Sequence, residues 1–187
     1  MKIKGYSTTH KAKHLGSLRE AMLAALNGDR DFMKIPALDW IIEYLESNTI
    51  PYVVCGGLAA QAYGSTRDLA DVDIYVPDEY LYQIVQMGKN YVTYGPARYV
   101  DDEWDLTFVQ FEFENQKVEI ASDKECKILD SEIGEWHQEI IDFNKYKVCY
   151  IYDRSIKVMK KDDLISYKRK LNRQVDIEDI KQIQQSV

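Results

Sequence analysis

Apolar residues follow two different periods along this chain. Between residues 35 and 45 they recur at helical spacing behind Pro36, which predicts a helix with the proline in its first turn. From Asp105 to Phe113 apolar and polar residues alternate, and the alternation returns at 118–121 after the polar turn 114–117, so a β-hairpin is predicted. Both periods occur in one chain, which indicates a fold that mixes helices and strands.

The same reasoning assigns the rest of the sequence. In chain order, the pattern predicts a helix from Ser17 to about Gly28, a helix at 36–47, a strand at 51–55, a helix at 56–64, a strand at 71–76, a helix at 78–88 capped by Asp78, strands at 105–113 and 118–121, strands at 146–152 and 156–159, and helices from Asp162 onward with a break near 174–175.

These elements predict an α+β fold, in which a mixed sheet is flanked by helices and followed by a C-terminal helical segment. We expect residues 1–16 to form a flexible arm and 17–187 a single domain. Within that domain the core covers about 36–160 and the C-terminal helices about 161–185.

Composition and charge narrow the classes of function. The 187 residues carry a net charge of −7, which argues against a protein that coats nucleic acids, although two basic stretches near the termini leave a local patch open. The three cysteines are too widely spaced for a disulfide framework or a zinc site. No apolar run is long enough to cross a membrane, so we expect a cytoplasmic protein without a membrane partner. We expect Trp104, Trp136 and the 14 tyrosines to serve in packing.

Two acids stand two residues apart in the predicted strand 71–76. Alternate residues of a strand point to one face, so Asp71 and Asp73 project together with their Cα atoms roughly 6–7 Å apart. Two carboxylates at this distance repel each other, and a hard divalent cation such as Mg²⁺ would remove the repulsion.

A third acid from a neighbouring strand would complete such a metal site. Glu119 lies between Val118 and Ile120 in the return strand of the predicted hairpin and is the best placed candidate. Glu112 lies between two phenylalanines in the outgoing strand and has the same local pattern. The sequence leaves both open.

Gly56-Gly57 lies where a predicted strand turns into a helix. Glycine allows a phosphate group to approach the backbone closely, and N–H groups at a helix start favour anions. Ser65 and Arg67 follow that helix and would add a hydroxyl and a guanidinium to the same phosphates. Arg67 has an alternative role as an ion-pair partner of Asp68 or Asp71.

The combined pattern is Gly56-Gly57, then Tyr63-Gly64-x-x-Arg67-x-x-x-Asp71-x-Asp73-Ile74. It resembles the DNA polymerase β-type nucleotidyltransferase superfamily, and is closest to small bacterial branches: the toxins of type IV toxin–antitoxin systems and the lincosamide and aminoglycoside nucleotidyltransferases. The C-terminal run Asp163-Leu164-Ile165-x-x-Lys168-x-x-x-x-Arg173-x-x-Asp176-x-x-Asp179-Ile180 is similar to the helical end of the toxin-like branch.

This resemblance implies roles for particular residues. Asp71, Asp73 and Glu119 would hold Mg²⁺, or Mn²⁺ in its place. Gly56, Gly57, Ser65 and Arg67 would bind the nucleoside triphosphate, and Lys168 would contact a phosphate or act on the acceptor. The chain departs from the toxin pattern at Ser65-Thr66, where a proline commonly precedes the arginine, and in having Glu as its third acid.

The C-terminal residues also have structural alternatives. Lys168 would then belong to a basic helix face, Asp176 would cap the last helix, and Asp179 would compensate the helix dipole.

Two functions follow as hypotheses. The first is a metal-dependent enzyme that transfers a nucleoside monophosphate from an NTP to a hydroxyl or phosphate acceptor on a small molecule, a tRNA or a protein. The second is a catalytically inactive nucleotide-binding or interaction module, for example one that binds an antitoxin. The presence of all three candidate acids favours the enzyme.

Overall fold

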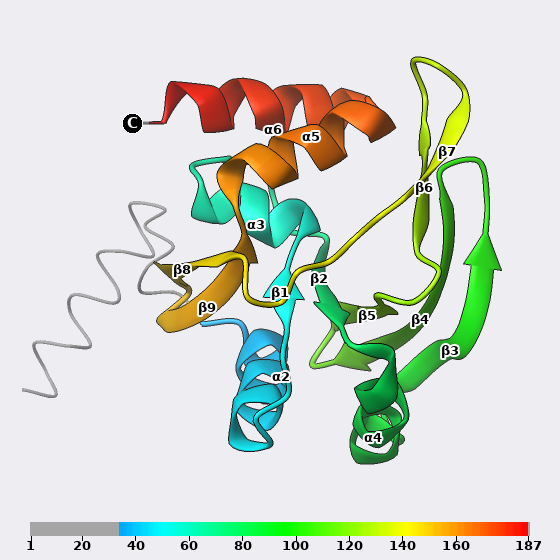
Figure 1. Ribbon diagram of the computed structural model, residues 1–187. Coiled ribbons are helices and arrows are strands. Elements are labelled where there is room, and N and C mark those ends of the chain that lie inside the picture. Colours follow the sequence, from blue (N-terminus) through cyan, green and yellow to red (C-terminus); the bar gives the residue numbers. More distant parts are fainter. Residues whose placement is uncertain (1–33, 187) are drawn as a thin grey trace, which may run out of the picture.

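A nine-stranded mixed sheet forms the centre of the fold, in the order β7-β6-β4-β5-β2-β1-β9-β8 with β3 paired on β4. The computed structural model describes residues 34–186 (Figure 1). The strands are β1 Val53–Val54, β2 Asp71–Val76, β3 Val92–Val100, β4 Trp104–Phe113, β5 Gln116–Ser122, β6 Lys127–Asp130, β7 Glu135–Gln138, β8 Tyr146–Ile151 and β9 Arg154–Met159. The helices are α2 Pro36–Ser47, α3 Gly56–Ala62, α4 Asp78–Gly88, α5 Lys161–Leu171 and α6 Gln174–Gln185.

The helices lie on opposite sides of the sheet. In Figure 1, α2 and α4 lie in the lower half, and α3, α5 and α6 lie together in the upper half. Helix α2 buries an apolar stripe at helical spacing that begins at Ala37 and ends at Leu45. On this side of the sheet Trp40 packs edge-on against Phe111 of β4, with 5.5 Å between the ring centroids.

The alternation in β4 sends its residues to two different environments. Val109 and Phe111 point toward α2 and are fully buried. Leu106, Phe108 and Gln110 point to the opposite face, which the upper helices cover only in part. That second face carries the candidate acids.

The hairpin between β4 and β5 has a shorter turn than the sequence suggested. Phe113 pairs with Gln116, so Glu114 and Asn115 alone form the loop. Both loop residues have positive φ angles, 49° and 64°, which is the conformation of a two-residue turn that follows the twist of the strands. Gln116 and Lys117 belong to the strand, and the predicted turn at 114–117 was too long.

Other sequence predictions hold with small corrections. The helices at 36–47 and 78–88 and the strand at 71–76 are confirmed. Asp78 does not cap its helix: it is the first helical residue, Pro77 is the N-cap, and the Asp78 carboxylate accepts a hydrogen bond from Ser122. The C-terminal break lies at Asn172-Arg173, where Asn172 adopts a left-handed conformation, and not at 174–175.

Three strands were missed. In β3 the sequence Gly95-Pro96 suggests a turn, but the strand passes through it with shifts in its register to β4. Strands β6 and β7 have four residues each, too few for a clear period. The predicted arm at 1–16 and helix at 17–28 lie outside the described residues.

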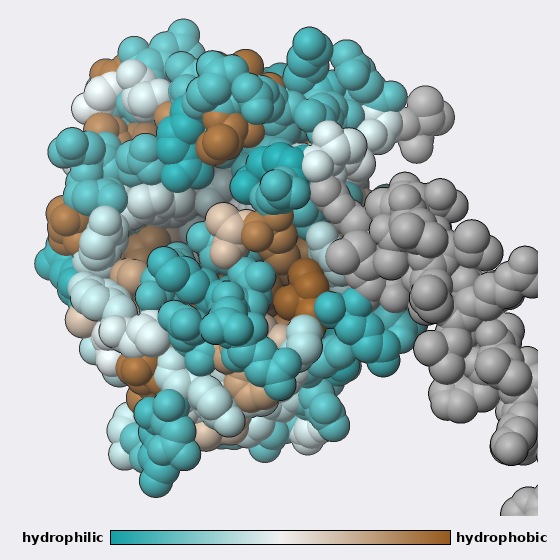
Figure 2. Space-filling view, turned by 180° about the vertical axis from the view of Figure 1, so that it is seen from behind, coloured by the Kyte–Doolittle hydropathy of each residue, from teal (hydrophilic) through white to brown (hydrophobic). Residues whose placement is uncertain are grey.

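The predicted fold class is confirmed, since helices flank a mixed sheet and the described chain ends with the two helices α5 and α6. Among residues 34–186, no helix has the length and apolar character that crossing a membrane requires. Seen from behind, the surface is largely hydrophilic with scattered apolar patches (Figure 2).

Candidate active site

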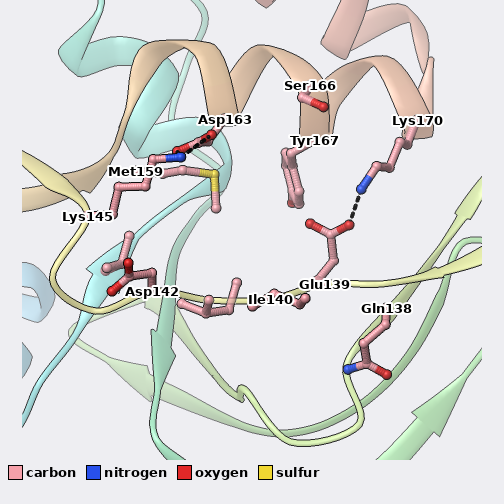
Figure 3. Close-up of a pocket in the computed structure, with 12 residues that line it drawn as sticks. Gln138, Glu139, Ile140, Asp142, Lys145, Met159, Asp163, Ser166, Tyr167 and Lys170 are labelled. Carbon is pink, nitrogen blue, oxygen red and sulfur yellow. Dashed lines mark hydrogen bonds and ion pairs between the residues drawn. The ribbon is translucent and has the colours of Figure 1, made fainter.

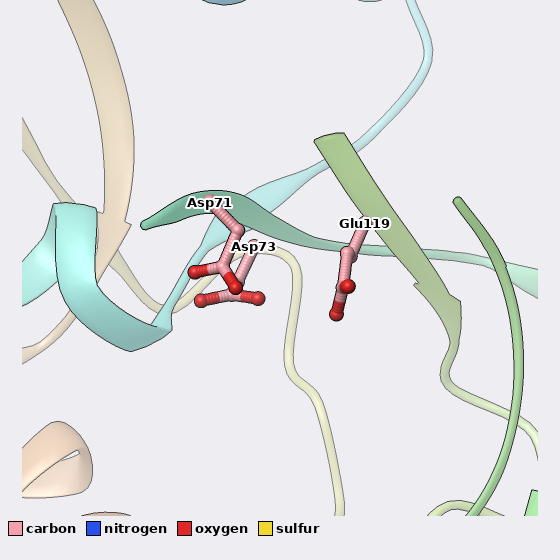
Figure 4. A group of neighbouring side chains, drawn as sticks. All are labelled: Asp71, Asp73 and Glu119. Atoms are coloured by element: carbon pink, nitrogen blue, oxygen red, sulfur yellow. The ribbon is translucent and has the colours of Figure 1, made fainter. Parts of the chain in front are cut away.

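Three acids meet on the open face of the sheet. Asp71 and Asp73 project from β2, and Glu119 projects in the same direction from β5 (Figure 4). The two strands run parallel, and Asp73 pairs with Glu119 in the ladder. One carboxylate oxygen of each residue lies within 4.8 Å of the others. The structure therefore gathers the three acids that the sequence singled out.

Glu112 lies elsewhere on the same face. It pairs with Lys117 near the turn end of the hairpin, two residue pairs beyond Gln110–Glu119, and its side chain is exposed. Glu112 does not belong to the carboxylate group. The choice that the sequence left open between the two glutamates is settled by this register in favour of Glu119 as the neighbour of Asp71 and Asp73.

The carboxylates are poorly compensated by their surroundings. Burial, followed by the charges of Asp71 and Glu119, raises the pKa of Asp73 to about 7, although the Gly57 N–H donates a hydrogen bond to it. Burial also raises the pKa of Glu119, and the hydrogen bond from Gln110 Nε2 to Glu119 Oε1 (2.7 Å) opposes that shift. Such a cluster favours a bound cation.

The two glycines allow close contacts that any side chain would prevent. Gly56 has a φ of +58°, and a Cβ atom there would lie 1.8 Å from Asp73 Oδ2. A Cβ atom on Gly57 would lie 2.4 Å from Arg67 Nη2. The glycine turn thus brings the backbone against a carboxylate on one side and a guanidinium on the other.

Arg67 is held by an acid far away in the sequence. Its Nε donates to Asp179 Oδ2 at 3.1 Å, and its Nη1 donates to the backbone oxygen of Asp68 at 3.4 Å. Ser65 is buried and donates from Oγ to Asp179 Oδ1 at 2.6 Å. The hydrogen bonds from Ser65 and Lys168 lower the pKa of Asp179, although burial by itself would raise it. Arg67 lines the cavity described below, and Ser65 does not.

Lys168 belongs to the same buried network. Its side chain is 1% exposed, and Nζ lies 3.1 Å from Asp176 Oδ1 and 2.9 Å from Asp179 Oδ2. Asp176 also accepts a hydrogen bond from Arg173 Nε at 2.7 Å, and it accepts one from the backbone N–H of Arg173 at 3.3 Å as the third residue of α6, whose N-cap is Arg173 and not Asp176. Lys168, Asp176 and Asp179 are all buried, and the lysine contacts both acids. An exposed basic helix face would not bury Lys168, and compensation of a helix dipole would not require Asp179 to pair with it.

One cavity of about 840 Å³ lies between the open face of the sheet and the C-terminal helices. This volume is within the range of small-molecule sites. Its walls are formed by the glycine turn, the three acids, Arg67 and Lys168, and by further residues of β3, β4 and α5–α6: Thr93, Tyr94, Tyr99, Asp101, Glu103, Trp104, Leu106, Phe108, Gln110, Tyr167, Arg173 and Val175.

Sequence reasoning missed the wall formed by β3. Tyr94 and Tyr99 were assigned to packing, but both line the cavity. The available signal was two runs of β-forming residues, Tyr91 to Tyr94 and Tyr99-Val100, and Gly95-Pro96 between them obscured it.

A second cavity of about 440 Å³ lies behind α5, against the segment 138–145 (Figure 3). Ion pairs cross it from Lys145 to Asp163 and from Glu139 to Lys170. None of the candidate site residues lines this cavity. Four of the five charged residues that line it form these two ion pairs, so it has no counterpart of the three neighbouring carboxylates.

Comparison with known proteins bears on the fold that carries this site. No family model matches the chain, and no curated protein matches its sequence. Among solved structures it is similar to a Thermotoga maritima protein classed as a nucleotidyltransferase, with 21% identity, a TM-score of 0.60, and coverage of 83% of this chain and 97% of the other.

Two antibiotic-modifying enzymes have the same fold. The lincosamide adenylyltransferase LnuA, in its lincomycin-bound form, is 14% identical with a TM-score of 0.56 and coverage of 83% and 99%. The enzyme ANT(2")-Ia, in complex with adenylyl-2"-tobramycin, is 15% identical with a TM-score of 0.54 and coverage of 81% and 87%. The chain therefore has the nucleotidyltransferase fold that its sequence motif resembles.

Proposed function

We propose that this protein is a metal-dependent nucleotidyltransferase that moves a nucleoside monophosphate from an NTP to a hydroxyl acceptor. The observation that carries the proposal is the carboxylate group Asp71–Asp73–Glu119 beside the glycine turn and Arg67, inside a cavity on this fold. An oxygen of the acceptor forms a bond to the α-phosphorus, the bond from that phosphorus to the β-phosphate oxygen breaks, and pyrophosphate leaves. The proton of the acceptor hydroxyl passes to water.

The donor set fits a hard divalent cation. Three carboxylates whose oxygens lie within 4.8 Å of one another match the oxygen ligands that Mg²⁺ and Mn²⁺ prefer. When bound, such an ion neutralises phosphate charge and orients the reacting oxygens. Asp71, Asp73 and Glu119 would hold it.

The remaining residues bind and orient the triphosphate. Gly56 and Gly57 let a phosphate approach the backbone, and Arg67 presents its guanidinium to the same volume. Lys168 and Ser65 act through Asp179, which holds Arg67 in place, and not by direct contact with phosphate. This proposal gives Ser65 and Lys168 roles that differ from those that the resemblance implied, although Lys168 lines the cavity.

Among the acceptor classes, a small molecule is the best supported. The two antibiotic-modifying enzymes of the same fold were solved with lincomycin and with adenylyl-2"-tobramycin. The net charge of −7 opposes a tRNA acceptor. The presence of the full carboxylate group argues against the inactive module, including one that only binds an antitoxin.

Label transfer tests the proposal directly. The purified protein is incubated with Mg²⁺ and each α-labelled NTP, against itself, total tRNA and a small-molecule extract. We expect label to move to a small molecule, and to do so in none of the reactions with the Asp71→Asn/Asp73→Asn variant. Magnesium-dependent NTP binding without any transfer would instead favour the inactive module.

Gly57→Ala should weaken NTP binding while leaving the fold intact. The new Cβ must displace the Arg67 guanidinium, but alanine is a good helix former and Gly57 is a helical residue. We expect the Kd for Mg-NTP to rise about tenfold, by loss of a charge-assisted contact, as measured by calorimetry.

The double variant Gly57→Ala/Arg67→Ala provides the control. If the alanine acts through Arg67, the double variant binds NTP no more weakly than Arg67→Ala alone. Additive losses would show that Gly57 contributes independently of Arg67.

A further inference from the structure

One wall of the large cavity is aromatic. Tyr94 and Tyr99 of β3 and Phe108 of β4 pack against one another, with centroid distances of 5.1 Å for Tyr94–Phe108 and 5.6 Å for Tyr99–Phe108. Tyr94 and Tyr99 are nevertheless 40% and 37% exposed. We call these three residues the aromatic platform. Exposed rings gathered on a cavity wall indicate a surface for a ligand.

The platform is fixed before any ligand arrives. Tyr99 donates a hydrogen bond from its hydroxyl to Asp101 Oδ2 at 2.8 Å, which holds the ring orientation. Asp101 is held in turn by the backbone N–H groups of Glu103 and Trp104. A rigid surface binds a ring with little further loss of conformational entropy.

The platform lies across the acids from the glycine turn. The sheet order places β2, β5, β4 and β3 side by side, so the path from Gly57 crosses the carboxylates before it reaches the rings. Thr93 donates to Gln110 Oε1 at 2.9 Å, and Gln110 donates to Glu119. An acceptor on the platform would therefore approach the carboxylates from the side opposite to the triphosphate, as in-line transfer requires.

The charges around the platform oppose an anionic acceptor. Asp101 and Glu103 lie at the same end of the cavity. Within residues 34–186, the cations that line the cavity are Arg67, Lys168 and Arg173, and each bonds a carboxylate of Asp176, Asp179 or Glu103. The cation at the platform end, Arg173, is already paired with Glu103 and Asp176, so a phosphorylated acceptor would have to compete with these carboxylates.

We propose that the acceptor is an uncharged or cationic small molecule that carries a hydroxyl group and an aromatic or flat apolar ring, and that its ring stacks on the platform. The proposal rests on the proposed transferase function and specifies its acceptor. A phosphorylated acceptor and a nucleic acid are both excluded by it. So is use of the platform for the nucleobase of the NTP.

The test measures acceptor and nucleotide binding separately. The full-length protein is saturated with Mg²⁺ and the α,β-methylene analogue of ATP, which cannot transfer its nucleotidyl group. Saturation-transfer NMR then screens hydroxyl-bearing compounds in matched series: aromatic uncharged, aromatic cationic, aromatic phosphorylated and ring-free. The same screen is run on Tyr94→Ala and Phe108→Ala, with Tyr82→Ala as the control, since Tyr82 is a 72% exposed tyrosine on α4 outside the cavity.

We expect compounds to bind from two of the series, the aromatic uncharged one and the aromatic cationic one. Their affinity should fall about tenfold in Tyr94→Ala and Phe108→Ala, as for loss of an aromatic contact at a binding hot spot, and should not change in Tyr82→Ala. Tyr99→Phe keeps the ring and should bind nearly as well as the unaltered protein. Nucleotide affinity should stay within about twofold in every variant.

Three results would overturn the proposal. In the first, the phosphorylated or ring-free series binds at least as strongly as the aromatic series. In the second, neither the uncharged nor the cationic aromatic series binds. In the third, Tyr94→Ala or Phe108→Ala weakens nucleotide binding. Failure of the proposed function has a different signature: the unaltered protein would not bind the nucleotide analogue in a magnesium-dependent way.

Discussion

Asp73→Asn is expected to abolish nucleotidyl transfer and to raise the stability of the metal-free protein. Loss of one ligand from the carboxylate group removes several kcal/mol of metal-assisted stabilisation, so transfer should fall by about 10³-fold or more. Label transfer measures this effect. The same change removes a charge that the metal-free fold accommodates poorly.

The stability gain depends on pH in a defined direction. The folded-state pKa of Asp73 is raised to about 7 by burial and by its acidic neighbours, so ionised Asp73 destabilises the metal-free fold above pH 7. The penalty decreases as pH falls from 7 toward the pKa of an unfolded aspartate, near 4. We expect Asp73→Asn to stabilise the protein by about 1–2 kcal/mol at pH 8 and by almost nothing at pH 4.

Thermal denaturation with and without Mg²⁺ checks both sides of this prediction. The unaltered protein should gain stability from Mg²⁺ and the variant should not. Asp68→Asn, at an exposed acid nearby, is the matched control and should alter neither transfer nor melting. A variant that melted earlier than the unaltered protein at pH 8, or kept its response to Mg²⁺, would contradict the assignment of Asp73.

Lys168→Met should lower the free energy of unfolding strongly and should have a smaller effect on NTP affinity. Removal of Nζ takes a buried cation away from Asp176 and Asp179, which are 0% and 1% exposed. Breaking a buried pair on one side leaves uncompensated charge, so we expect the free energy of unfolding to fall by about 3–5 kcal/mol. Urea denaturation measures the loss.

A surface ion pair supplies the comparison. Lys124 lies 3.7 Å from Asp78, and its side chain is 66% exposed. Lys124→Met should cost no more than about 1 kcal/mol. If Lys168→Met were as mild as this control but strongly reduced NTP affinity, then Lys168 would contact the nucleotide and would not be a positioning residue.

Local features of the site could be predicted because they lie within one short segment. Asp71 and Asp73 share a strand face by the period of two alone, and Gly56-Gly57 marks the strand end on its own evidence. Glu119 and Glu112 could not be separated, since both lie on the same face of one hairpin. Only the parallel pairing of β5 with β2, which the sequence does not encode locally, distinguishes them.

The buried network was out of reach for the same reason. Asp179 and Arg67 are 112 residues apart in the chain, and nothing near Arg67 indicates that its partner lies on the last helix. Ser65 and Lys168 looked like ligands of phosphate because each stands near a motif. In the folded protein both contact Asp179, and these contacts are the basis of the positioning role proposed for them.

The two-residue turn at Glu114-Asn115 has a consequence for how this protein can vary. Val118 and Ile120 are buried because they alternate with Glu119, so the same register that fills the core also aims the carboxylate. Adding or deleting one residue in the turn would exchange the two sets of side chains between the faces of the strand. In a library randomised at this turn, we therefore expect active variants to carry many different residues that tolerate positive φ at positions 114 and 115. We expect almost no active variant whose turn is longer or shorter than two residues.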